Sequence, residues 1–526
     1  MNWQLTGAPN WQSKEAAKHG MASEQAAADS DFTILIKRAP TPRPAPVALA
    51  EAASLAEPPP NAPVPRAEPP GQAALRELAR RAPRYASFIG NNDVRRSLES
   101  IVAEIDRQLA AQINLILHHP EFQQIEASWR GVRFLVDSTQ TGPLLKIKLL
   151  DISKRELHRS LRKFHGTAWD QSPLFRRVYE EEFGQLGGEP YGVLIGDYEF
   201  DHRPEDVQLL GLVAQVAAAA HTPFIAAAAP SVMQMDTWAE LANPRDLTRI
   251  FQTPEYTAWR SLRDGEDTRY LGLCLPRFLA RLPYGARTDP TEGFDFEEQV
   301  EGPDGRRYLW TNAAYAMGAN ITRAFDLYAW CVQIRGVDTG GAVDGLPVLT
   351  FPTADGDVDR RCSTEIALSE RREAELSRNG FIPLVHRKGS DFAAFISVPS
   401  LQKPQEYADP AATVNAAVSS RLPYLFACCR FAHYLKCMVR DKIGGSMNRS
   451  QLQGWLRRWL NRYVDGMPND SDEEWKATHP LIEADVTLEG KDDAPGYYDA
   501  RIFLRPHFQM EGLTASLRLV SRVPAQ

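Results

Sequence analysis

The spacing of apolar side chains differs between parts of the chain. Residues 93–117 carry an apolar side chain every three or four positions, which predicts an amphipathic helix with Asn92 or Asp93 as its N-cap. Pro120 suits the first turn of a second helix. The apolar face of that helix comprises Phe122, Ile125, Trp129 and Val132. The pattern therefore predicts an N-terminal helical region.

From residue 144 onward, short apolar runs alternate with helical patterns. The runs, which predict buried strands, are 144–150, 191–195, 223–228, 270–275, 347–351, 381–385 and 392–396. The helical patterns between and after them include 205–219, 309–329, 369–378 and 413–441. Gly380 is placed to end the helix that precedes residue 381. Alternation of this kind predicts a mixed α/β core.

The C-terminal region changes to a period of two. Its alternating apolar positions are Ala484, Val486 and Leu488, then Tyr498, Ala500, Ile502 and Leu504, and finally Ala515, Leu517 and Leu519. This alternation predicts antiparallel strands with one apolar face. The turn-like segment 490–496 predicts a hairpin, followed by a third strand close to the chain end. Such a strand is free to pair with another chain.

A proline-rich segment precedes the ordered patterns. Between Pro40 and Pro70 lie 11 of the 38 prolines of the chain. A segment of this composition buries too little apolar surface to fold alone, so it predicts an extended linker. We therefore expect a disordered tail at 1–71, a helical region at 72–142, an α/β core at 143–443 and a C-terminal β region at 444–526.

Charge and composition exclude several classes of partner. The net charge of −7 and the dispersed basic residues argue against nucleic acid. The six cysteines show no regular spacing, which is typical of a reduced, cytoplasmic protein. Residues 1–20 lack the apolar stretch of a signal peptide. The segment 211–230 is interrupted by polar residues and by Pro223, which favours a buried helix and strand over membrane insertion.

One acidic loop is the best candidate for chemistry. Asp197, Glu199, Asp201 and Asp206 follow the predicted strand 191–195, where α/β sheets often bind ligands. Their alternation resembles the start of a calcium loop, but His202 replaces the glycine and Gln208 the final glutamate. A solvated or interface loop is the favoured interpretation. An α/β enzyme that uses this loop is an alternative.

A second candidate is a helix face with Cys429, His433 and Cys437. A zinc site needs a fourth ligand and a better geometry than one helix supplies, so core packing is favoured. Motifs of nucleotide binding, serine hydrolases and zinc proteases are missing from the sequence. We therefore predict no catalytic residue, no metal and no cofactor.

Four long blocks in the sequence resemble a known family. They are 119–137; 175–201; 260–285 with 308–316; and 380–444 with 495–506 and 512–524. Together they cover roughly residues 97–524. In these blocks the chain resembles the large sheath subunit of the type VI secretion system, the TssC or VipB family. The resemblance implies a fold like that of phage tail sheaths, and a structural rather than an enzymatic role.

The resemblance also implies partners. Members form an obligate heterodimer with a small sheath subunit, and the heterodimers build a helical six-fold tube around an inner tube protein. A baseplate triggers contraction, which propels the inner tube. Terminal strands cross between subunits, which makes Ala515, Leu517, Leu519 and Arg522 the candidate intersubunit strand. A sheath or baseplate component of another contractile injection machine is the alternative.

Members can also carry a short N-terminal helix that a hexameric AAA+ unfoldase grips after contraction. Residues 13–28 match that helix poorly, so recognition by an unfoldase is left open.

Overall fold

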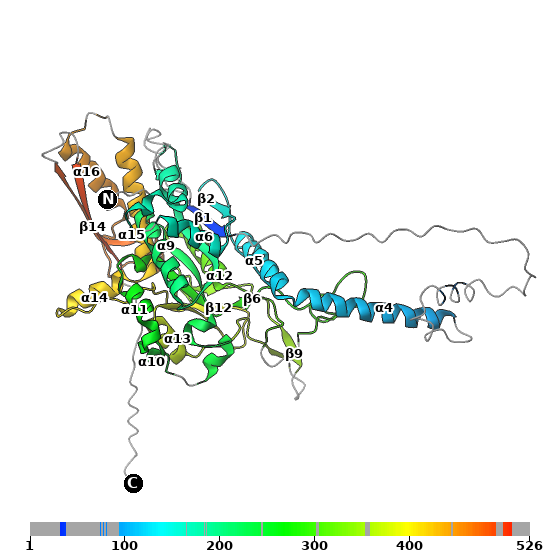
Figure 1. Ribbon diagram of the computed structural model, residues 1–526. Helices are drawn as coiled ribbons and strands as arrows, with labels where there is room; N and C mark the ends of the chain where they lie inside the picture. The colour runs from blue at the N-terminus through cyan, green and yellow to red at the C-terminus, as the bar shows by residue number, and fades with distance from the viewer. Residues whose placement is uncertain are drawn as a thin grey trace, which may run out of the picture. The chain divides into compact units, whose positions relative to one another are not determined.

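The computed structural model describes residues 32–37, 74, 77, 80, 94–164, 166–183, 185, 187–243, 246–300, 305–352, 358–442, 445, 447–490 and 498–507 (Figure 1). These residues belong to two compact units. The larger unit contains residues 1–39, 127–280 and 310–526, and the smaller contains 40–126 and 281–309. The smaller unit is thus made from two segments that are distant in the sequence.

A mixed sheet of eight described strands forms the centre of the larger unit. Its order is β2 (Leu145–Leu150), β1 (Phe32–Lys37), β3 (Tyr191–Phe200), β4 (Phe224–Ala228), β5 (Leu271–Leu275), β11 (Phe381–His386), β12 (Ala393–Phe395) and β8 (Ala342–Val343). The pairs from β2 to β11 are parallel, and β12 and β8 continue the sheet antiparallel. The predicted α/β class is confirmed.

Three two-stranded sheets accompany the large sheet. They pair β6 (Phe278–Leu279) with β7 (Trp310–Thr311), β9 (Thr350–Pro352) with β10 (Val358–Arg360), and β13 (Leu481–Gly490) with β14 (Tyr498–Pro506). The run predicted at 347–351 therefore lies in a small separate sheet. The hairpin predicted near the C-terminus is β13–β14, whose partners run from Glu483 opposite Arg505 to Gly490 opposite Tyr498.

The described residues also form a series of α-helices. The helices are α4 (Val94–Leu117), α5 (Pro120–Asp137), α6 (Lys154–Lys163), α7 (Pro173–Phe175), α8 (Glu181–Phe183), α9 (Pro204–Ala220), α10 (Leu247–Gln252), α11 (Thr257–Asp264), α12 (Ala313–Tyr328), α13 (Glu370–Arg378), α14 (Pro410–Ser419), α15 (Leu422–Asp441), α16 (Arg449–Leu460) and α17 (Glu473–Thr478). Helices α9 and α12 both pack against β4 and β5.

Local signals explain several helix ends. Pro120 begins α5, as predicted. Ser369 accepts a hydrogen bond from the backbone of Arg372 and so caps α13. Gly380 has a φ of +84°, which is the left-handed conformation that ends a helix and favours glycine. These residues fix where the elements of the core begin and end.

The helix predicted at 413–441 is two helices in the structure. The two helices are separated at Arg421, which has extended backbone angles (φ −90°, ψ 132°) and immediately precedes α15. Pro423 lies in the first turn of α15, where its missing amide costs nothing. A proline also disfavours helical angles in the residue before it, so one continuous helix through this point is unfavourable.

Strand β1 is an element that the sequence analysis missed. It lies inside the segment predicted as a disordered tail and pairs parallel with β2 and β3. Ile34 lies opposite Ile147 on one side and opposite Val193 on the other. The domain boundary predicted at 71 stays a prediction, but at least this stretch of the tail belongs to the core sheet.

Two hydrophobic cores lie in the larger unit, and α15 contributes to both. Leu422, Phe426 and Cys429 belong to the core around the large sheet. Phe431 and Tyr434, farther along the helix, belong to a second core. The second core also contains Trp330, Leu456, Leu460, Tyr463, Val486 and Leu488. Helix α15 therefore connects the sheet to the C-terminal hairpin as one packed element.

Candidate functional site

The four acids predicted to form a loop lie in three elements: Asp197 and Glu199 are in β3, which extends beyond the predicted strand 191–195, Asp201 follows β3, and Asp206 is in α9. Protein donors bind three of them. Ser128 and Asn312 hydrogen-bond to Asp197. Ser231 Oγ donates to Asp201 at 3.1 Å, and Lys154 Nζ donates to Asp206 at 2.6 Å. These protein donors thus bind the carboxylate groups that a metal ion would need as ligands.

Glu199, the remaining acid of this set, lies in β3 and is part of an ionic chain. Its carboxylate lies 3.7 Å from Arg277, which makes two hydrogen bonds of 2.9 Å to Glu365. Among the described residues there is no group of three or more His, Cys, Asp or Glu side chains able to hold a metal. Asp201 is only 7% exposed, whereas the Glu199 side chain is 43% exposed. The carboxylates bond to side chains of neighbouring elements, and the predicted interface role of this segment stays a prediction.

Cys429, His433 and Cys437 lie on α15, and all three side chains are buried. His433 Nε2 donates to the carbonyl oxygen of Ala220 at 2.9 Å, and its ring contacts Phe183 edge-on. Burial raises the pKa of the Cys429 thiol and lowers the pKa of His433, each well away from its ordinary value. The packing agrees with the predicted core role, because both groups are held neutral.

A serine–histidine contact is present that the sequence analysis did not identify. Ser363 Oγ lies 3.1 Å from His386 Nδ1, and burial lowers the pKa of His386. A nucleophilic serine must reach its substrate, but Ser363 is only 1% exposed. Its carbonyl oxygen accepts from the backbone of Leu279. The pair joins two segments of the core and offers no route to covalent chemistry.

The C-terminal hairpin has one apolar and one charged face. Val486 and Leu488 pack into the second core, with Ile502 partly buried against it. On the other face, Arg501 pairs with Glu489 at 3.2 Å. Among the described strands, β13 and β14 form a two-stranded sheet, and Leu481 at the start of β13 also forms a bridge to Val464. A hairpin of this kind can accept strands from other chains.

The predicted intersubunit strand lies outside the described residues. Ala515, Leu517, Leu519 and Arg522 all follow residue 507, where the described part of the chain ends. Their role stays a prediction.

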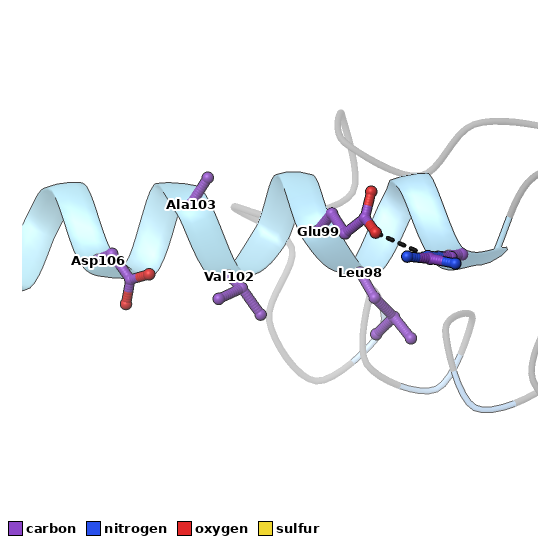
Figure 2. A pocket seen from close by; sticks show the side chains of 6 residues that line it. Leu98, Glu99, Val102, Ala103 and Asp106 are labelled. Atoms are coloured by element: carbon purple, nitrogen blue, oxygen red, sulfur yellow. Dashed lines mark hydrogen bonds and ion pairs between the residues drawn. The ribbon is translucent and has the colours of Figure 1, made fainter. Parts of the chain in front are cut away.

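The smaller unit carries an exposed apolar surface on α4. Figure 2 shows Leu98 and Val102 on the same side of α4, where they help to line a hollow. The described residues that line it belong to α4: Arg95, Leu98, Glu99, Val102, Ala103 and Asp106. Exposed apolar side chains of this kind are typical of a protein contact surface.

An ionic cluster holds the two segments of the smaller unit together. Arg281, which is 6% exposed, bonds to Glu126 at 2.8 Å and to Glu298 at 2.5 Å. Asn114 on α4 donates to the carbonyl oxygen of Glu297 at 3.2 Å. The segment that follows Arg281 is thereby fastened beside the end of α4. Sequence reasoning missed this cluster, because its members are up to 172 residues apart in the chain.

The segment 211–230 contains the end of α9 and all of β4, as predicted. No helix within the described ranges has the length and apolar character needed to span a membrane.

Comparisons with known proteins cover nearly all of the ordered chain. Residues 99–402 match the VipB family model, described as the EvpB/VC_A0108 tail sheath N-terminal domain. Residues 411–523 match the VipB_2 model, the EvpB/VC_A0108 tail sheath gpW/gp25-like domain. The join between the two models precedes α14 and lies N-terminal to the domain boundary that the sequence predicts at 443.

A relative of high similarity is the type VI secretion system sheath protein TssC1 of Pseudomonas aeruginosa. The two are 60% identical over 460 residues, which cover 88% of this chain and 92% of the relative. Among solved structures, the anti-feeding prophage baseplate has a chain with a TM-score of 0.38 and 9% identity, covering 74% of this chain and 80% of that one. The contracted helical sheath of the same particle gives a TM-score of 0.36 and 11% identity, with coverage of 74% and 82%.

Proposed function

Because this chain belongs to the VipB family of type VI secretion tail sheath proteins, we propose that its work is entirely mechanical. It is the large subunit of a contractile sheath and assembles with a partner sheath subunit. The observation that carries this conclusion is the match of both family models, in order, over residues 99–523. The identity of 60% extends over nearly the whole relative, so the likeness is not confined to one shared domain.

The proposed assembly is an obligate heterodimer with a small subunit, stacked in six-membered rings around an inner tube in the cytoplasm. Subunits join in an extended, strained arrangement, and a baseplate releases it. Neighbouring rings then rotate and compact together, because packed interfaces switch between discrete arrangements. The two-stranded sheet of β13 and β14 supports this proposal, since strands of other subunits can extend a small sheet and keep the subunits linked while the rings turn.

Contraction of this kind does not require this chain to catalyse a reaction. The candidate acidic loop is held by Ser128, Ser231 and Lys154, and the candidate serine is buried. We propose that the protein is not an enzyme and binds no cofactor. Calorimetric titration with Ca²⁺, with Asp197→Ala as control, should show no saturable heat in either protein. Saturable binding that Asp197→Ala abolishes would revive the enzyme hypothesis.

Co-expression with the small sheath subunit tests the proposed function. Electron micrographs of the purified pair should show hollow tubes, and the large subunit alone should be insoluble or misassembled. An obligate interface is expected to bury about 2,000 Å² or more, much of it apolar, which explains why the single chain would aggregate. Recovery of a stable, monodisperse monomer, or a pair that never forms tubes, would contradict the proposal.

A further inference from the structure

The C-terminal hairpin is one hydrogen-bond donor short at the end where the chain leaves it. Strand β14 ends at Pro506, which lies opposite Leu481 at the start of β13. Proline has no backbone amide proton, so β14 donates no hydrogen bond at this rung of the ladder. Residues 508–526, which include the predicted intersubunit strand, follow almost immediately. The ladder by itself therefore holds the end of β14 weakly.

His507 supplies contacts at the end of the hairpin where the ladder is short of a donor. Its backbone amide donates to the carbonyl oxygen of Pro480 at 3.1 Å, and its ring Nε2 lies 3.1 Å from the carbonyl oxygen of His479. The same Nε2 lies 3.5 Å from a carboxylate oxygen of Asp465. Both neighbours of Nε2 are acceptors, so this nitrogen carries a proton and donates it. We call His507, Asp465 and the two carbonyl groups of His479 and Pro480 the hairpin latch.

Asp465, the acidic member of the hairpin latch, is itself fixed in place. Its side chain is 1% exposed, and Oδ1 accepts from the amide of Met467 at 3.0 Å and from Ser471 Oγ at 2.8 Å. Its backbone amide donates to the carbonyl oxygen of Leu481 at 2.7 Å. The hairpin latch therefore joins the end of β14 to the start of β13 and to the segment 464–471.

The place of the hairpin latch determines how the hairpin responds to a pull on the chain end. The start of β13 and the end of β14 lie at the same end of this antiparallel pair. A pull away from β13 on the residues beyond His507 would therefore separate the two strands one rung at a time, beginning at Leu481 and Pro506. Hydrogen bonds that are loaded singly resist less force than hydrogen bonds that share the load. Because His507 comes before the first rung on this path, the hairpin latch must open before the ladder can.

We propose that the hairpin latch is a tension anchor, which holds β14 to the body of the subunit while the C-terminal segment is pulled by a neighbouring subunit. This inference rests on the proposed function, which supplies the pull, and on the predicted intersubunit strand. His507 is a positioning residue in this scheme, because it acts through β14 and the segment that follows it. The hairpin latch matters most in assembled tubes, where that segment is under load, and less in a pair that is not linked to its neighbours.

Hydrogen exchange with and without linkage between subunits tests this inference. His507→Ala is co-expressed with the small subunit, once alone and once together with Leu517→Asp, which is expected to prevent linkage. Exchange of residues 500–505 should accelerate about tenfold more in tubes than in the unlinked pair, because tension adds to the loss of the hairpin latch. Equal acceleration in both would mark an ordinary structural contact and overturn the inference. Tubes that form despite Leu517→Asp would remove the linking role of the C-terminal segment, and the inference would fail with it.

Two further variants separate this inference from the proposed function. His507→Gln keeps a side-chain donor for the latch acceptors and should restore slow exchange. His479→Ala removes a neighbouring ring but keeps the carbonyl group, so it should behave as wild type. Loss of tubes in His507→Ala, with binding to the small subunit retained and normal tubes in His507→Gln, would also support the anchor. If wild-type tubes form and His507→Ala tubes are as abundant and exchange as slowly, the latch inference fails alone. If the wild-type pair forms no tubes, the proposed function fails.

Discussion

His433 on α15 donates its Nε2 proton to the carbonyl oxygen of Ala220 at 2.9 Å, across 213 residues of sequence. The bond connects α15 to the last residue of α9. Burial and the nearby charges of Arg430 and Lys436 oppose a positive charge on the ring, so the pKa of His433 is well below its ordinary value. Burial therefore holds the imidazole neutral, although the hydrogen bond to Ala220 by itself favours the protonated ring.

This contact predicts acid sensitivity of the folded protein. The unfolded chain takes up a proton at His433 below about pH 6.5, whereas the folded chain does not. Stability is thus fully present above pH 6.5 and is lost as the pH falls, at about 1.4 kcal/mol per pH unit for this one group. Urea unfolding of the heterodimer between pH 7 and 5 measures the slope.

A matched pair of variants isolates the contribution of His433. His433→Gln keeps a donor but cannot take up a proton, so it should reduce the slope by about 1.4 kcal/mol per pH unit. His119→Gln, at an exposed position, should leave the slope unchanged. Equal slopes in wild type and His433→Gln would contradict the assignment.

Arg281 is expected to be critical for the smaller unit. Arg281→Met would leave Glu126 and Glu298 without their shared cation, and the carboxylate of Glu298 is almost fully buried. Breaking a buried ion pair from one side costs about 3–5 kcal/mol. Hydrogen exchange of residues 281–300 should accelerate strongly.

Two variants act as controls for that prediction. Arg133→Met removes an exposed ion pair with Asp137, so it should cost less than about 1 kcal/mol. Arg281→Met combined with Glu298→Gln removes the stranded charge and should recover part of the protection. Exchange that is as slow in Arg281→Met as in wild type would show that the cluster does not hold this segment.

The C-terminal strand predicted from the sequence gives a test of assembly. Leu517→Asp or Leu519→Asp would place a charge on the apolar face of the strand, and we expect either variant to block tube formation. Ser516→Asp places the same charge on the polar face and should assemble normally. The readout is the number of tubes in electron micrographs of each co-expressed pair. Normal tubes from Leu517→Asp and Leu519→Asp would refute this strand assignment.

The hydrophobic periodicity of the sequence was sufficient to predict most helices and strands of the core. Buried strands such as β4 and β5 are short apolar runs, and α9 and α12 are long amphipathic or apolar patterns, so their types and approximate ends follow from local sequence. The junction near Arg421 was missed because a helical period continues on both sides of Pro423. The domain boundary predicted at residue 443 was also hard to place, because α15 packs into both hydrophobic cores of the larger unit.

The candidate sites depended on long-range contacts that local patterns do not contain. Asp197 and Asp201 are recognisable as candidate acids in the sequence, but their partners Ser128, Asn312 and Ser231 come from distant segments.

Strand β1 leads to the last prediction. It is only six residues long and immediately precedes the proline-rich segment, yet it occupies an interior position of the sheet between β2 and β3. An interior strand uses its backbone amides for pairing on both sides, so a proline at Ile34 would remove a donor and distort both ladders. We expect Ile34→Pro to cost about 3 kcal/mol or more.

Hydrogen exchange measures this effect directly. In Ile34→Pro, amides of β2 and of residues 191–195 in β3 should lose protection together, because β1 is their shared neighbour. Ile34→Ala changes the side chain but keeps the amide, so it should retain most of the protection. If Ile34→Pro leaves both strands as protected as in wild type, another segment or another chain fills the space between β2 and β3 in solution. In that case residues 32–37 would belong to the tail, as the sequence alone predicts.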